Sequence, residues 1–166
     1  MDCEWNADVY ARQELPCQLA LLQLASQTRC YLIDMFKLKG TAGTEEWRHL
    51  AALFANPRII KVGFDLKQDS LMLKPYVASY EDGKGGVVDL MRVATGLKDG
   101  TGTSSLANLV NQLLGYPLSK VEQRSNWETR PLRKAQIVYA ATDAHVLVEL
   151  ALLPKFQLAC LASKPG

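Results

Sequence analysis

Residues 18–36 read QLALLQLASQTRCYLIDMF, two apolar runs separated by a polar turn near Gln27. Apolar runs of this length on either side of a short turn are typical of two antiparallel strands. The segment MDCEW at residues 1–5 alternates in polarity, which predicts a further strand beside this pair. The sequence therefore predicts a domain that begins with antiparallel strands.

Helices and strands alternate after this pair. The apolar residues of segment 41–56 recur every three or four positions, which predicts an amphipathic helix that ends before Pro57. The run RIIKVGF at 58–64 is rich in β-branched residues and predicts a buried central strand. Helical spacing in 65–73, DLKQDSLML, predicts a short helix, and GGVVDLMRV at 85–93 predicts a strand that leads into a small helix.

Two further helices are predicted in the second half of the chain. Ser104 or Ser105 is placed to cap a helix at 106–114, which Gly115 ends. From Pro131 to Pro154, with the first proline in the first turn, the chain predicts one helix of more than about five turns. The tail beyond it is expected to be peripheral. This order of elements predicts an α/β domain with a mixed sheet, antiparallel N-terminal strands and helices on both faces.

Composition is that of an ordinary globular domain. The chain has 166 residues, of which 48% are hydrophobic and 22% charged, with a net charge of +2, so one domain over 1–166 is expected. No secretory signal follows Met1 and no apolar run approaches the roughly 18 residues that cross a bilayer. These absences predict an intracellular protein of the cytoplasm or nucleus, with no membrane partner. The cysteines lack zinc-binding spacing, and Cys17 and Cys30 are expected to be buried free thiols.

Two acidic side chains lie close together in the first predicted strand. Asp2 and Glu4 are two residues apart, so they point to the same face. Such carboxylates repel each other unless a cation lies between them, although two solvated acids at a frayed terminus would give the same pattern. Asp69 follows the buried strand, where α/β domains carry functional groups, and a surface helix acid is the alternative. Nearby Asp65 is expected to cap that helix.

A further acid lies in the predicted last long helix. Tyr139, Asp143 and Leu147 are spaced by four and share one side of it. An aspartate on an apolar side is costly unless it is paired or binds a metal. The arginines available for a structural ion pair are Arg124, Arg130 and Arg133. A cluster of the four carboxylates would instead select Mg²⁺ or Mn²⁺, and two such ions can activate a water for attack on a phosphodiester.

Other polar features carry less information. The loop KDGTGTSS at 98–105 lacks the Lys-Ser/Thr ending of a phosphate-binding loop, which favours simple flexibility. His145 falls on the helix face opposite Asp143 and is expected outside the site. Trp127 with Arg130 is placed to contact substrate, but packing under the last helix is favoured. The cations that would form a phosphate-binding rim, or else ordinary surface charges, are Lys67, Lys74, Lys120 and Arg124.

Three segments resemble, in the same order, the DEDDy 3′–5′ exonucleases, a group with the ribonuclease H-like fold that includes ribonuclease D and the Werner-type and Nibbler-type enzymes. They are DCEW at 2–5, KVGFDLKQDSLML at 61–73 and SNWETRPLRKAQIVYAATDAHVL at 125–147. QLALLQLAS at 18–26 and SLANLVNQLLGYPLSK at 105–120 are also similar to that family. The resemblance covers nearly the whole chain, and it is nearest to the Nibbler type.

The resemblance implies a ribonuclease H-like fold and a specific set of site residues. The metal-binding acids would be Asp2, Glu4, Asp69 and Asp143, and Tyr139 would orient the attacking water. Asp2, Glu4 and Asp143 would hold the ion beside that water, and Asp2 with Asp69 would serve a second ion. The family's first strand has residues before its acidic pair, so this chain is expected to start inside that strand, as a truncated form.

The expected function follows from this resemblance. It is a metal-dependent 3′–5′ exonuclease that uses two Mg²⁺ or Mn²⁺ ions and releases nucleoside 5′-monophosphates from single-stranded nucleic acid, with RNA favoured over DNA. The alternative is a nucleic-acid-binding or scaffolding module of the same fold, catalytically impaired by the shortened first strand.

Overall fold

A computed structural model describes residues 1–6, 18–39, 45–77, 86–97 and 102–162. The strands are β1 (Asp2–Trp5), β2 (Leu19–Ala25), β3 (Cys30–Asp34), β4 (Lys61–Gly63) and β5 (Val87–Asp89). The helices are α2 (Met35–Lys39), α3 (Glu45–Ala55), α4 (Lys67–Leu73), α5 (Leu90–Gly96), α6 (Leu106–Leu114), α7 (Lys134–Leu152) and α8 (Pro154–Ala162).

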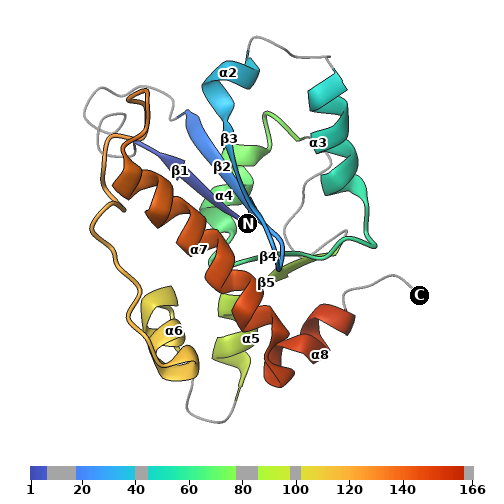
Figure 1. Ribbon diagram of the computed structural model, residues 1–166. Helices are drawn as coiled ribbons and strands as arrows, with labels where there is room; N and C mark the ends of the chain where they lie inside the picture. Colours follow the sequence, from blue (N-terminus) through green and yellow to red (C-terminus); the bar gives the residue numbers. More distant parts are fainter. Residues whose placement is uncertain (7–17, 40–44, 78–85, 98–101, 163–166) are drawn as a thin grey trace.

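The strands form an antiparallel and a parallel group. β1, β2 and β3 pair antiparallel in that order, with Asp2 opposite Gln23. β4 and β5 pair in parallel. The amino group of Met1 donates a hydrogen bond to the carbonyl oxygen of Val62, so the start of β1 lies beside β4 (Figure 1). The predicted antiparallel start is confirmed by the pairing of β1, β2 and β3. The strand expected over 58–64 is limited to Lys61–Gly63.

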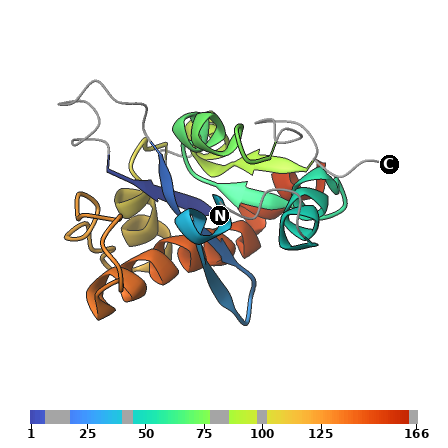
Figure 2. The same ribbon diagram turned by 90° about the horizontal axis from the view of Figure 1, so that it is seen from above.

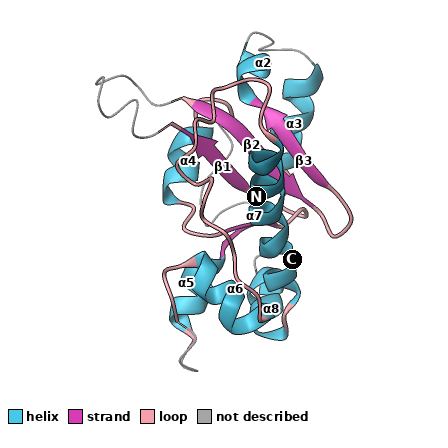
Figure 3. Cartoon of the chain, turned by 60° about the vertical axis from the view of Figure 1, so that its left-hand side comes forward, coloured by secondary structure: helices cyan, strands magenta, loops and turns pink. Residues whose placement is uncertain are grey.

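Helices cover both faces of this strand layer. α7 contacts β1, β2, β3 and β4, and α4 packs against β1 from the opposite side (Figure 2). α5, α6 and α8 gather around the C-terminal half of α7 (Figure 3). This arrangement confirms the predicted α/β fold class, with antiparallel N-terminal strands and helices on both faces. The predicted mixed sheet is divided, among the described residues, into an antiparallel sheet of three strands and a parallel sheet of two.

The side chains of β2 alternate between two apolar clusters. Leu22 packs with Leu66 and other side chains on the α4 side, whereas Leu21 packs with Trp127 and Ala140 on the α7 side. Both leucines are buried. Because a strand sends successive side chains to opposite faces, β2 anchors α7 on one side and α4 on the other.

Caps fix the limits of two helices. Ser105 caps α6 by accepting a hydrogen bond from the main-chain nitrogen of Asn108, and Gly115 ends this helix with φ = +79°. Both assignments were predicted. α7 begins at Lys134, so the prediction that Pro131 lies in its first turn is wrong. Arg133 is still extended, and its main-chain nitrogen donates to Gln136 Oε1 at the first turn of the helix.

The expected peripheral tail is instead a packed helix. Residues Pro154–Ala162 form α8, which contacts α5 and α7. Phe156 is completely buried in a cluster with Val88, Leu109 and Leu150. The single aromatic side chain of this segment therefore ties it to the core.

Cys30 is exposed, contrary to the prediction of a buried thiol. It starts β3, which has a neighbouring strand on one side only among the described residues, and its sulfur lies 3.5 Å from the carbonyl oxygen of Ala141. An apolar run indicates a strand but does not show that the strand is at an edge. Cys3 is buried, and Cys17 lies outside the described residues.

In the part of the chain that the structure describes, one helix meets the length and mean hydropathy of a membrane-crossing segment. This helix is α7, and 39% of its most apolar 18-residue window is buried in the fold. No apolar run of about 18 residues was expected, and α7 meets the mean hydropathy although Asp143 and Glu149 interrupt its apolar residues. In the fold α7 packs on the strands and carries a buried acid at its middle.

Candidate metal centre

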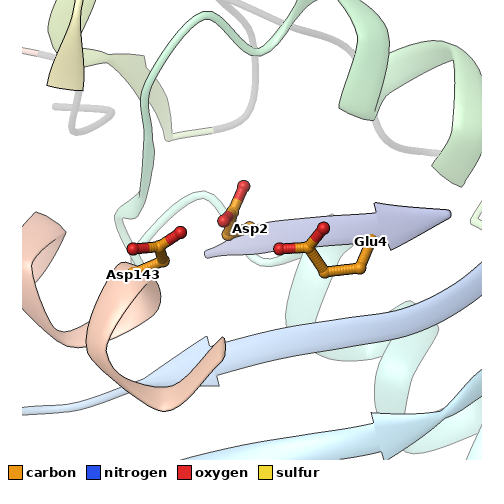
Figure 4. A group of neighbouring side chains, drawn as sticks. All are labelled: Asp2, Glu4 and Asp143. Atoms are coloured by element: carbon orange, nitrogen blue, oxygen red, sulfur yellow. The ribbon is translucent and has the colours of Figure 1, made fainter. Parts of the chain in front are cut away.

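Three carboxylates meet between β1 and α7. Asp2 and Glu4 project from β1, and Asp143 projects from the middle of α7 (Figure 4). One oxygen of each side chain lies within 4.8 Å of the corresponding oxygens of the other two. Asp2 is half-buried and Glu4 is 7% exposed, and both lie in a strand that pairs with β2, so the alternative of two solvated acids at a frayed terminus is wrong. Asp143 is 6% exposed.

Asp69 reaches the same region from the other side of β1. It lies in α4, is only 6% exposed and accepts a hydrogen bond from the thiol of Cys3. Its Oδ1 is buried without a hydrogen-bond partner in the structure. The alternative of a surface helix acid is therefore wrong.

In the absence of a cation, burial favours the protonated form of these carboxylates. Burial, and after it the negative charge of Asp2, raises the pKa values of Asp69 and Asp143 to about 7. Burial, together with the charges of Asp2 and Asp143, raises the pKa of Glu4 to about 10. A bound cation would remove both causes, since it would solvate the oxygens and screen their repulsion.

Two of the three arginines expected to neutralise Asp143 have other partners. Arg130 Nε donates to Asp34 at 2.7 Å, and Arg133 Nη2 donates to Glu122 at 2.6 Å. These pairs contradict a structural ion pair between either arginine and Asp143. The hydrogen bond with Tyr139 and the charge of Lys120 lower the pKa of Asp143, but burial outweighs them. Asp143 Oδ1 is buried without a hydrogen-bond partner in the described structure.

Tyr139 lies one turn before Asp143 on the same side of α7. Burial, then the charge of Asp143, raises the pKa of Tyr139 well above its usual range, so the hydroxyl keeps its proton at neutral pH. The tyrosine ring lies 5.9 Å from the fully buried ring of Trp127. The favoured packing role for Trp127 is therefore confirmed. Asn6, which follows β1, holds Trp127 by accepting its main-chain N–H at 2.8 Å.

These side chains line one open cleft of about 670 Å³. All five predicted site residues line it, namely Asp2, Glu4, Asp69, Tyr139 and Asp143. Lys120 and Arg124 also line the cleft, whereas Lys67 and Lys74 do not. His145 stays outside, as predicted, with its Nε2 3.3 Å from Glu149.

The loop predicted over 98–105 is described only in part. Residues 98–101 lie outside the described residues, so the alternative of a phosphate-cradling loop is not addressed there. Ser104 and Ser105, at the end of this loop, line the cleft. Lys120 Nζ donates to Ser105 Oγ at 3.5 Å. The positively charged side chain of Lys120 therefore lies next to the start of α6, in the lining of the cleft.

Sequence reasoning missed the acid that shapes the turn before α4. Asp89 accepts hydrogen bonds from the main-chain nitrogens of Asp65, Leu66 and Met91. The predicted capping role of Asp65 is wrong, because it has φ = +54° and α4 has no side-chain cap. The available signal was the position of Asp89 at the carboxyl end of β5, where neighbouring parallel strands bring their turns together.

The comparisons with known proteins converge. The model of a 3′-5′ exonuclease family matches residues 1–157. The chain is 37% identical to exonuclease mut-7 of Caenorhabditis elegans and 32% identical to ribonuclease D of Desulfotalea psychrophila, over 80% and 84% of its length. It spans only 16% and 34% of those two relatives. The crystal structure of the Aedes aegypti Nibbler EXO domain has a TM-score of 0.74, is 28% identical, and matches 99% of this chain and 80% of that one.

Proposed function

Because the chain belongs to the 3′-5′ exonuclease family, we propose that it is a metal-dependent 3′–5′ exonuclease. It would remove nucleotides from the 3′ end of single-stranded nucleic acid and release nucleoside 5′-monophosphates. The observation that carries this proposal is the meeting of Asp2, Glu4 and Asp143 in one cleft, with a buried and unpartnered oxygen on Asp143.

The residues present fit a hard divalent cation. All the donors are carboxylate oxygens, which suit Mg²⁺ or Mn²⁺ and not softer metals. Asp2, Glu4 and Asp143 would hold one ion, and Asp2 with Asp69 would serve a second. Such ions activate a water and stabilise the leaving oxygen of a phosphodiester. The unpartnered oxygens of Asp69 and Asp143 support this assignment, since a buried carboxylate oxygen without a partner is otherwise costly.

The proposed role of Tyr139 is to orient the attacking water. Its hydroxyl keeps its proton because burial and Asp143 raise its pKa, so it acts as a hydrogen-bond donor and not as a base. Its ring packs on Trp127, which restricts where the hydroxyl points. The position one turn from Asp143 places this donor beside the carboxylates.

The cleft offers the proposed substrate both acidic and basic side chains. Lys120 and Arg124 line the cleft together with the acids and would contact backbone phosphates. Its volume of about 670 Å³ lies in the range of cavities that bind small ligands, which suits a terminal nucleotide. RNA is favoured over DNA because one of the similar proteins is a ribonuclease. The complete set of acids and Tyr139 disfavours the alternative of a catalytically impaired module.

The direct test is digestion of matched single-stranded RNA and DNA, labelled at the 5′ end, with Mg²⁺ and with Mn²⁺. We expect a ladder that shortens stepwise from the 3′ end, faster on RNA. A circular single-stranded RNA of the same sequence is the control and should resist. Cutting of the circle at the rate of the linear strand would show an endonuclease. No cutting of any substrate with either metal would support the scaffolding module.

A further inference from the structure

Gln23 is a buried polar residue in the middle of β2. Its side chain is 0% exposed, and it lies directly opposite Asp2 in the strand register. It shares the α7-facing side of β2 with Leu21, which packs against α7 and Trp127. A fully buried amide costs free energy unless it is hydrogen-bonded, so its partners are informative.

Its partners are atoms of the candidate metal centre. With the amide nitrogen toward β1, Gln23 Nε2 donates to the main-chain oxygen of Asp2 at 3.2 Å and to Asp2 Oδ2 at 3.3 Å. The reverse orientation would set the amide oxygen against these two acceptors, so the neighbours determine which way the amide points. The Gln23 side chain also hydrogen-bonds Glu4, which opposes the rise in the pKa of that acid.

These contacts restrict the carboxylate of Asp2, which interacts with the other acids of the candidate metal centre. The charge of Asp2 acts on Glu4, Asp69 and Asp143, so it stands at the centre of the repulsion between them. A donor that holds both the main chain and one carboxylate oxygen of Asp2 fixes the rotation of this side chain. Donors behind a metal ligand commonly change metal affinity by about 10- to 100-fold when they are removed.

We propose that Gln23 is a positioning residue that orients the Asp2 carboxylate for a divalent cation and thereby sets the affinity of the metal centre. This inference rests on the proposed metal-dependent function. Gln23 itself contacts neither the cation nor the substrate. It acts through Asp2, from the strand next to the one that carries the acids.

The test is Gln23→Met, which keeps the length of the side chain and removes its N–H donors. We expect the Mn²⁺ dissociation constant, measured without substrate by electron paramagnetic resonance of free Mn²⁺, to rise about tenfold or more. The matched control is Leu22→Val, at the neighbouring buried position whose side chain faces the other side of β2. It should unfold at a lower temperature but bind Mn²⁺ as the parent does.

The outcomes separate this inference from the proposed function. If the parent binds Mn²⁺ and digests RNA while Gln23→Met binds Mn²⁺ within twofold of the parent, the positioning role is wrong. Equal losses of affinity in Gln23→Met and Leu22→Val would also overturn it, because they would indicate general loosening. If the parent binds no Mn²⁺ and digests nothing, the proposed function itself fails. Gln23→Asn, with a shorter amide that cannot span the same distance, gives the same readout if the methionine variant does not fold.

Discussion

Tyr139 and Asp143 lie on the same face of α7, one turn apart, yet the proposal gives them separable roles. Asp143→Asn removes a charge from the metal centre, so Mn²⁺ affinity and cleavage rate should fall together. Tyr139→Phe removes only a hydroxyl, so Mn²⁺ binding should persist while the rate falls by about 10²–10⁴. The measurements are Mn²⁺ titration and single-turnover cleavage of a 5′-labelled RNA. A phenylalanine variant that cuts at the parental rate would reduce Tyr139 to a packing residue.

The raised pKa of Asp143 predicts how the metal-free protein responds to pH. An aspartate has a pKa near 3.8 when unfolded, and burial raises it to about 7 in the fold. Between these values the folded state binds more protons than the unfolded state, so this group's contribution to stability is complete below pH 4 and is lost as pH rises to about 7.

Asp143→Asn mimics the protonated acid and should be free of this loss. In a chelator, its melting temperature should match the parent near pH 4 and exceed it by several degrees at pH 7. The measurement is thermal unfolding of both proteins across that range, with Asp65→Asn as the control because Asp65 is an exposed acid. A constant difference between Asp143→Asn and the parent at every pH would contradict the assignment of this pKa.

Spacing predicted the acids because it reports which side chains share a face. Asp2 and Glu4 follow the period of a strand, and Tyr139 and Asp143 follow that of a helix. Gln23 was not found, since a glutamine within an apolar strand looks like an outward-facing polar residue. Only the register of β2 against β1 reveals that it points at Asp2.

At the scale of elements, β1 and the start of α7 are joined by a short hydrogen-bond network. Asn6 Nδ2 donates to Asn126 Oδ1 at 2.7 Å, and Asn6 Oδ1 accepts the main-chain N–H of Trp127. Gln136 in the first turns of α7 donates to the main-chain oxygen of Asn126 and to Ser125 Oγ. This network holds the acids of β1 at a constant position relative to the side chains of α7.

Asn6→Ala should therefore destabilise the fold. It leaves the buried main-chain N–H of Trp127 without a partner, which costs about 1–3 kcal/mol. Exposed Asn126 loses one donor but still accepts a hydrogen bond from the main-chain nitrogen of Glu128. The measurement is urea unfolding, with Asn111→Ala on the exposed face of α6 as the matched control. The control should change stability by less than about 0.5 kcal/mol. An Asn6→Ala variant as stable as this control would show that the network does not hold β1 to α7.

The limits of elements were less predictable than their existence. Pro131 signals a helix start, but Arg130, on its N-terminal side, pairs with Asp34 of β3. Arg133 is still extended immediately before the helix begins at Lys134. Similarly, α8 lacks an amphipathic pattern, and Phe156 is its one buried side chain. Both outcomes depend on contacts with elements distant in sequence, which a local pattern does not contain.

On the scale of the whole molecule, the candidate metal centre joins three elements that are far apart in the sequence. β1 supplies Asp2 and Glu4, α4 supplies Asp69, and α7 supplies Asp143. The order of elements was predictable from periodicity. This order is sufficient to bring β1 together with α4 on one face and α7 on the other. The cleft itself was not predictable, because its walls include the turn at Asp65 and the segment around Lys120.

A cation that binds between these elements should stabilise the entire fold. Without it, repulsion among the buried carboxylates opposes folding, and a ligand at 100 times its dissociation constant adds about 2.7 kcal/mol. For a domain of this size, that corresponds to a rise of roughly 5–10 °C in melting temperature. The measurement is a Mn²⁺ titration against a chelator.

Two aspartate variants make this titration specific to the centre. Asp65→Asn removes an exposed acid that lines the same cleft, in a left-handed conformation that asparagine tolerates, so the Mn²⁺-induced rise should persist. Asp143→Asn should remove most of it, because the cation loses a ligand on the helix that it joins to β1. An equal rise in both variants would place the bound Mn²⁺ elsewhere on the surface. An unchanged melting temperature in the parent would mean that the cleft is not a metal centre. The repulsion between the carboxylates would then be relieved by protonation alone, as their raised pKa values allow.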